Sequence, residues 1–194
     1  MSRRPFVAIL VVAVGAAFSS VAAAPHAQPT KTVSAKQWAK AFWGTVADWV
    51  EAATAGSEEL DVTIGTEDDA VAIRAALVSY IDDVSDQTST TIKKLKRAGD
   101  PDVKNGKKNA KKIAKTLRNG FVEIRDTLDD ASVVAGDMPI DSVSGADAAA
   151  QEAQDVIQEG FGAFDDALGK VKRLDKGGLN KVMAKTSACQ RLGN

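Results

Sequence analysis

The chain has 194 residues, 25 basic and 26 acidic side chains, one histidine and one cysteine, and a formal net charge of −1 at pH 7. A single cysteine excludes a disulfide within the chain. The only histidine, His26, lies in a polar leader, which excludes Ser-His-Asp and Cys-His catalysis, di-iron Glu-x-x-His pairs and an ordinary zinc site. We therefore expect a non-catalytic protein without cofactor or metal.

Residues 1–23 have the layout of a secretory signal peptide: two arginines, an apolar run and small residues, with cleavage after Ala23 or Ala24. The start "SRRPFVA" also resembles a twin-arginine signal, so the general secretory and twin-arginine routes both stay open. If uncut, the segment is an N-terminal anchor, because residues 6–24 approach the length of about 20 residues that spans a bilayer. We expect a secreted or extracytoplasmic protein.

Residues 24–33 form a polar, proline-bearing flexible leader, and residues 34–194 a single helical domain. The first predicted helix begins at Ser34, which makes a capping box with Gln37, and Gly56 is its natural stop. Its apolar face, at helical spacing, consists of Trp38, Phe42, Thr45, Val46, Trp49 and Ala53. Trp43 lies off this stripe, so it either meets the C-terminal helix or is exposed to a partner.

The second predicted helix opens at Thr66, with Asp69 three residues on, and Gly99 closes it. Its apolar seam is Ala70, Ile73, Leu77, Ile81, Val84, Thr88, Thr91, Leu95 and Ala98. Thr88 and Thr91 place a polar layer in the core, where their hydroxyls bond back to the preceding turn.

The third helix is expected to start with Asp100 as its N-cap and Pro101 as its first residue. Its seam is Val103, Gly106, Ala110, Ile113, Leu117, Phe121, Ile124, Leu128 and Ala131.

The fourth helix is expected to start at Ser144, with Asp147 as its capping partner, and to end at Gly177 and Gly178. Its seam is Ala146, Ala149, Ala153, Ile157, Phe161, Phe164, Leu168, Val171 and Leu174. A short tail helix follows within residues 179–192.

Glycines also lie inside the predicted helices, at Gly44, Gly106, Gly120, Gly160 and Gly162. Each lowers helix stability by about 1 kcal/mol relative to alanine. They indicate close helix contacts, and a ligand notch beside Gly160 and Gly162 is the alternative.

No window alternates apolar and polar residues for long enough to predict a strand. The sequence predicts an all-α fold, an antiparallel up-down-up-down four-helix bundle with a short C-terminal helix, because long helices joined by short breaks pack most economically as antiparallel neighbours.

Charge changes sign along the chain in five blocks. The net charges are +3 for residues 31–47, −10 for 48–91, +9 for 92–118, −11 for 119–166 and +6 for 167–194. In an up-down-up-down bundle the basic blocks meet at one end and the acidic blocks at the other. The lysines are then either a solvated face, neutralised across the bundle by exposed pairs such as Lys115 and Arg118 with Asp82, Asp83, Asp165 and Asp166, or a surface that docks onto an anion.

The functional interpretation is an exported, non-catalytic binding or structural module of the cell envelope whose basic end contacts an anionic component. That component is an envelope polymer, a lipid surface or an acidic protein; no specific nucleic-acid motif is present. The residues expected to make the contact are Lys93, Lys94, Lys96, Arg97, Lys104, Lys107, Lys108, Lys111, Lys112, Lys172, Arg173 and Lys176. The alternatives are a carrier of a small apolar ligand within the bundle, and an enzyme that uses only carboxylates and lysines.

Two further features leave alternatives open. Cys189 either pairs between two chains, giving a disulfide-linked dimer, or is a buried and inert thiol. The repeated Asp-Asp pairs in "IDDV", "LDDA" and "FDDA" either bind a hard cation or keep the helix surfaces soluble. If they only keep the surfaces soluble, the protein has no metal site.

The signal sequence, the Ala-, Asp- and Gly-rich helices, the hairpin "GDPDVKNGKKNAKKIAK" and the closing "ACQRL" together resemble small secreted helical-bundle proteins of actinobacterial type. This resemblance implies a fold and a compartment. It implies no activity and no functional residues, because such proteins have no assigned function.

Overall fold

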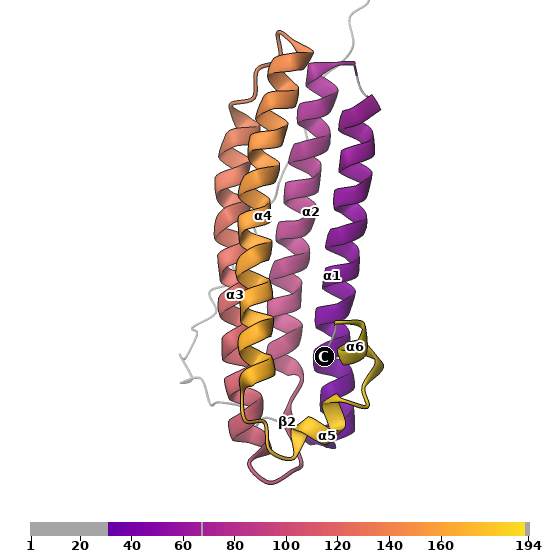
Figure 1. Ribbon diagram of the computed structural model, residues 1–194, viewed down its shortest axis with the longest axis vertical. Coiled ribbons are helices and arrows are strands. Elements are labelled where there is room, and N and C mark those ends of the chain that lie inside the picture. Colours follow the sequence, from indigo (N-terminus) through magenta and orange to yellow (C-terminus); the bar gives the residue numbers. More distant parts are fainter. Residues whose placement is uncertain (1–30, 67, 193–194) are drawn as a thin grey trace, which may run out of the picture.

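The computed structural model of the protein describes residues 31–66 and 68–192, and in this part of the chain the fold is all-α, as predicted (Figure 1). The elements are β1 (Thr32–Val33), α1 (Ala35–Thr66), α2 (Ala70–Arg97), β2 (Asp100–Pro101), α3 (Gly106–Gly136), α4 (Val143–Arg173), α5 (Leu179–Met183) and α6 (Ser187–Arg191). The predicted signal peptide, its cleavage sites and the alternative anchor lie outside the described residues. None of the helices in the described part has the length and apolar character needed to cross a membrane.

The four long helices pack together side by side along the long axis of the molecule (Figure 1). α3 and α4 make the most extensive contact, α1 packs on α2, and α2 contacts both α3 and α4. The short helices α5 and α6 pack against α1. The apolar seams predicted from the sequence therefore face one shared core.

Trp49 connects all four long helices at the centre of this core. Its indole Nε1 donates a hydrogen bond to Thr88 Oγ1 of α2 over 3.0 Å, and Thr88 Oγ1 donates to the Val84 carbonyl over 2.7 Å. The Trp49 ring meets Phe121 of α3 at a centroid distance of 5.0 Å and Phe164 of α4 at 5.1 Å. The predicted bond back to the preceding turn is thus confirmed at Thr88. It is not found at Thr91, which is buried but makes no side-chain hydrogen bond among the described residues.

Glycines let α3 and α4 approach each other closely. A Cβ on Gly120 would lie 2.9 Å from the Ala167 Cβ, and a Cβ on Gly160 would lie 2.1 Å from Thr127 Oγ1. The expectation of close contact is confirmed at these two positions, and the space beside Gly160 is filled by α3. It fails at Gly44 and Gly162, which meet no neighbouring atom within 4 Å.

The predicted boundary between the first two helices is wrong. Gly56 does not stop α1, because a Cβ there would lie 3.1 Å from the Tyr80 ring and the glycine serves as a contact point with α2. Thr66 is the last residue of α1, and its hydroxyl donates to the Val62 carbonyl over 2.8 Å. Asp69 caps α2 by accepting from the Val71 N–H over 2.9 Å.

The predicted start of the third helix is also wrong, as is the expectation of no strand. Asp100 and Pro101 form β2, which pairs in parallel with β1 and takes in the last two residues of the predicted leader. Gly99 closes the segment that contains α2, as predicted. Its φ of 83° lies in the left-handed region that favours glycine. α3 begins only at Gly106.

The fourth helix begins two residues before the predicted position. Ser142, rather than Ser144, is its N-cap, and the Ser142 Oγ accepts from the Gly145 N–H over 3.3 Å. The predicted tail helix is divided into α5 and α6. Trp43 was expected either to meet the C-terminal helix or to be exposed to a partner. Its side chain is fully buried in α1, the helix on which α5 and α6 pack, so exposure to a partner is excluded.

We expect Thr88→Val to lower the free energy of unfolding by about 1–3 kcal/mol, because the indole N–H of Trp49 loses its acceptor and stays buried. Urea unfolding followed by tryptophan fluorescence measures the change. Thr91→Val is the matched control, since Thr91 is also buried on α2 but makes no side-chain hydrogen bond among the described residues. Equal losses in the two variants would contradict the role assigned to Thr88.

We expect Gly160→Ala to destabilise the fold by about 1–3 kcal/mol through overpacking against Thr127. Gly162→Ala, two residues away on the same helix with open space around it, should instead stabilise the fold by up to about 1 kcal/mol. Thermal unfolding of both variants tests the pair. A stabilised Gly160→Ala variant would show that α3 and α4 are not in close contact at this point.

Candidate functional site

Basic segments that are far apart in the sequence lie at one end of the molecule. The pairing of β1 with β2 holds the start of α1 beside the connection between α2 and α3. The chain after α4 reaches the same place, since a Cβ on Gly178 would lie 3.4 Å from the Val103 Cβ. Figure 1 shows α5 and β2 at this end, which we call the basic end.

The acidic segments gather at the opposite end. It comprises the connections between α1 and α2 and between α3 and α4, and we call it the acidic end. The Gln154 amide of α4 donates to Asp61 of α1 over 2.9 Å, which ties the two acidic segments together.

Eleven of the twelve cations predicted to contact an anionic partner are exposed at or near the basic end. They come from the last turns of α2, the segment before α3, the first turns of α3 and the last turn of α4: Lys93, Lys94, Lys96, Arg97, Lys104, Lys107, Lys108, Lys111, Lys112, Lys172 and Arg173. Lys107 forms an ion pair with Asp100 over 3.0 Å.

Lys176 is the exception, and its assignment to the contact surface is wrong. The residue is only 8% exposed, and its Nζ donates to the Lys172 carbonyl over 2.9 Å. Burial lowers the pKa of Lys176, because the ammonium loses water, while neighbouring Cys189 acts weakly in the opposite direction.

Cys189 is fully buried under the C-terminal segment. Burial raises the pKa of its thiol to about 12, against a smaller lowering effect from Lys176. A disulfide between two chains stays a prediction, and it would require α6 to move away from α1 first.

The ion pairs named in the first alternative, which join Lys115 or Arg118 to the aspartates at 82, 83, 165 and 166, are absent among the described residues. Within residues 31–66 and 68–192 the ion pairs with distances of 4.0 Å or less join Lys107 to Asp100, Arg125 to Asp126, and Arg191 to Asp48 and Glu51. Lys115 and Arg118 have no carboxylate partner in this part of the chain, so their charges are available to other molecules.

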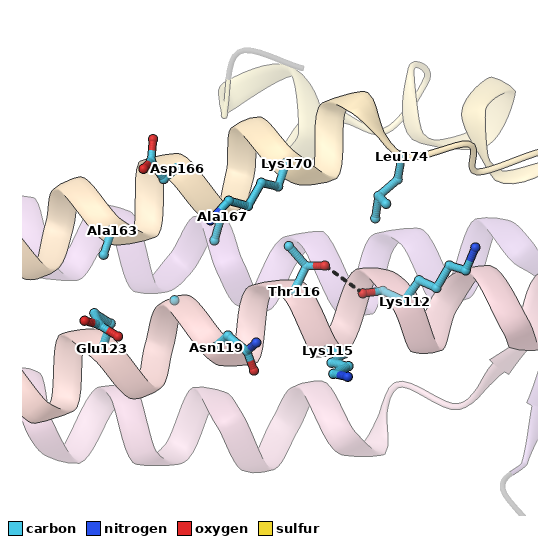
Figure 2. Close-up of a pocket in the computed structure, with 11 residues that line it drawn as sticks. Lys112, Lys115, Thr116, Asn119, Glu123, Ala163, Asp166, Ala167, Lys170 and Leu174 are labelled. Carbon is cyan, nitrogen blue, oxygen red and sulfur yellow. Dashed lines mark hydrogen bonds between the residues drawn. The ribbon is translucent and has the colours of Figure 1, made fainter.

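A groove between α3 and α4 carries part of this basic surface (Figure 2). It has a volume of about 600 Å³. The cations Lys112, Lys115 and Lys170 line it together with Glu123 and Asp166. Figure 2 shows Lys112 toward one end of the groove and the two carboxylates toward the other, so the groove runs from positive to negative along its length.

A smaller groove, of about 270 Å³, lies between α2 and α3. Lys96, Lys111, Lys115 and Arg118 line it above the apolar residues Ile92, Leu95 and Ala114. It contains four cations and no carboxylate among its lining residues, which makes it a strongly positive groove with an apolar floor.

Three cations that line these grooves were absent from the predicted contact set: Lys115, Arg118 and Lys170. The groove between α3 and α4 forms where Gly120 meets Ala167. The helix-interior glycine was therefore the one sequence signal that pointed to this groove. Its partner helix and its register could not be obtained from that glycine alone.

The described residues contain no group of three or more histidine, cysteine or acidic side chains arranged to hold a metal ion. Comparison of the chain with protein-family models, with curated proteins and with solved structures finds no match to any of them. The candidate site is therefore defined by its own chemistry, as a surface of exposed cations at one end of a helical fold.

We expect a maleimide or disulfide reagent at pH 8 to leave Cys189 unmodified in the folded protein, because burial keeps the thiol protonated and out of reach. The same reagent should label one thiol per chain in guanidinium chloride. Mass spectrometry of the two samples measures the difference. Rapid labelling of the native protein, or a dimer on a non-reducing gel, would contradict the buried position.

Proposed function

We propose that the protein is an exported, non-catalytic binding module whose basic end contacts an anionic component of the cell envelope. In this proposal the four long helices form an antiparallel up-down-up-down bundle, which separates positive and negative charge along its long axis. The single observation that carries the proposal is the gathering of exposed cations at one end.

The pairing of β1 with β2 and the contact of Gly178 with Val103 support the proposed arrangement, because they bring three basic segments together. The hydrogen bond between Gln154 and Asp61 supports it at the other end. With alternating helix directions, the three basic blocks sort to one end and the two acidic blocks to the other.

The scarcity of ion pairs favours binding over simple solvation. Cations neutralised within a protein contribute little to association, whereas a cluster of like charges without partners creates a field that attracts anions. Maintaining such a cluster raises the free energy of the folded state through self-repulsion. A bound anion would remove this repulsion.

The test is co-sedimentation of the purified protein with vesicles that contain phosphatidylglycerol and, separately, with insoluble envelope polymer. We expect binding at about 0.05 M salt that is largely lost at about 0.5 M salt, because screening shortens the range of the field. Absence of binding to both materials at low salt, or binding that salt does not change, would contradict the proposal.

Two matched variants locate the interaction on the molecule. Lys93→Gln, Lys94→Gln, Lys104→Gln and Lys108→Gln together remove four positive charges at the basic end. Thr54→Glu, Ala55→Glu, Ser132→Glu and Ala148→Glu together change the net charge equally, at exposed positions toward the acidic end. We expect the first variant to lose most of the binding and the second to keep it. Equal losses would show that net charge alone, and not the basic end, drives association.

A further inference from the structure

A separate cationic groove lies between the first turns of α1 and the C-terminal segment that contains α5 and α6. It has a volume of about 580 Å³. It is lined by four lysines, Lys36, Lys40, Lys181 and Lys185, and by the hydroxyl-bearing Thr186 and Ser187. We call it the lysine groove; none of its lysines belongs to the contact surface predicted from the sequence.

The lysine groove has no negative charge of its own. No carboxylate lines it, and none of its four ammonium groups has an ion-pair partner among the described residues. The acidic residues further along α1, Asp48 and Glu51, are bound to Arg191 instead. The groove is therefore a concave surface with four uncompensated positive charges.

The lysines are arranged in two pairs, each with a spacing of four residues. In α1 this spacing places both side chains on one helical face, whereas Lys185 lies in the turn that follows α5. Lys36 and Lys40 are one turn apart on α1, and Lys181 and Lys185 are four residues apart in the segment that begins with α5. Like charges at this spacing disfavour a helix. A polyvalent anion bound between the two pairs would relieve the repulsion on both walls at once.

The wall that carries Lys181 and Lys185 is held in place without a ligand. Leu179 and Met183 of α5 are buried, as are Ala188 and Cys189 of α6. Arg191 fixes the end of α6 to α1 through Asp48 and Glu51. The wall is thus organised in advance, which limits the ordering that binding would require.

The chemistry of the groove suits phosphate. All four cations are lysines, which act as compact point charges on flexible stems and bind phosphate oxygens from several directions. The hydroxyl of Ser187 makes no hydrogen bond among the described residues, so it can donate to a phosphate oxygen.

We infer that the lysine groove binds a linear chain of closely spaced phosphate groups, such as a segment of a phosphodiester polymer or polyphosphate. This inference deepens the proposed function and rests on it, because it names the class of anion. A concave groove receives a chain between its walls, whereas a flat lipid surface would touch only the protruding cations of the basic end.

Isothermal titration calorimetry of the purified protein with inorganic tripolyphosphate at about 0.05 M salt tests the inference. We expect one strong site per chain, with an affinity that falls as salt rises. Lys36→Gln, Lys40→Gln, Lys181→Gln and Lys185→Gln together should weaken binding about tenfold or more. The control lowers the net charge equally outside the groove and outside the basic end, with Thr54→Glu, Ala55→Glu, Ser132→Glu and Ala148→Glu, and should stay within about threefold of the unmodified protein.

A second variant protects the test against misfolding. Ser187→Glu changes one exposed side chain, places a carboxylate in the groove and should also weaken binding severalfold while thermal unfolding stays unchanged. Equal losses in the groove variant and the control variant would overturn the inference. If the protein co-sediments with phosphatidylglycerol vesicles but does not bind tripolyphosphate, the inference about the lysine groove is overturned in favour of a lipid surface. The proposed function would still stand. Failure to bind any anion would contradict both.

Discussion

The fold depends on the burial of one tryptophan whose polar atom is satisfied. Trp49 is 2% exposed, contacts aromatic rings from α3 and α4, and donates its N–H to Thr88 of α2. A large side chain of this kind contributes much of the apolar area that a core can bury, but only if its N–H finds an acceptor. The hydrogen bond therefore fixes the register of α1 against α2, and the surrounding phenylalanines fix both against the other pair of helices.

Helix faces could be predicted from the sequence, whereas helix ends could not. The apolar seams repeat every three to four residues, and such a period is readable without tertiary information. Gly56 and Thr66 gave false boundary signals, because one packs against Tyr80 and the other bonds back into its own helix. The strand at Asp100 was invisible for another reason: its partner lies near residue 32, and a two-residue pair leaves no alternation to detect.

The composition of the site was predictable, and its shape was not. A run of lysines from residue 93 to residue 112 marks a cationic surface in any arrangement that exposes it. Lys176 belongs to another basic segment, just after α4, yet the residue is buried and its ammonium is bonded to a backbone carbonyl. The grooves depend on which helices approach each other, as Gly120 and Ala167 do. The groove that Lys36 and Lys181 share joins segments far apart in the chain, which only folding brings together.

The parallel pairing of β1 with β2 has a consequence for orientation. The Lys31 carbonyl accepts a hydrogen bond from the Asp100 N–H over 3.1 Å, so the chain enters the fold directly beside the connection between α2 and α3. An attachment point at Lys31 therefore lies at the basic end and leaves the acidic end on the far side of the molecule. For measurements on a sensor chip, the protein could instead be attached near Ile140, which is 53% exposed and lies at the acidic end. This attachment would present the basic end to the solution.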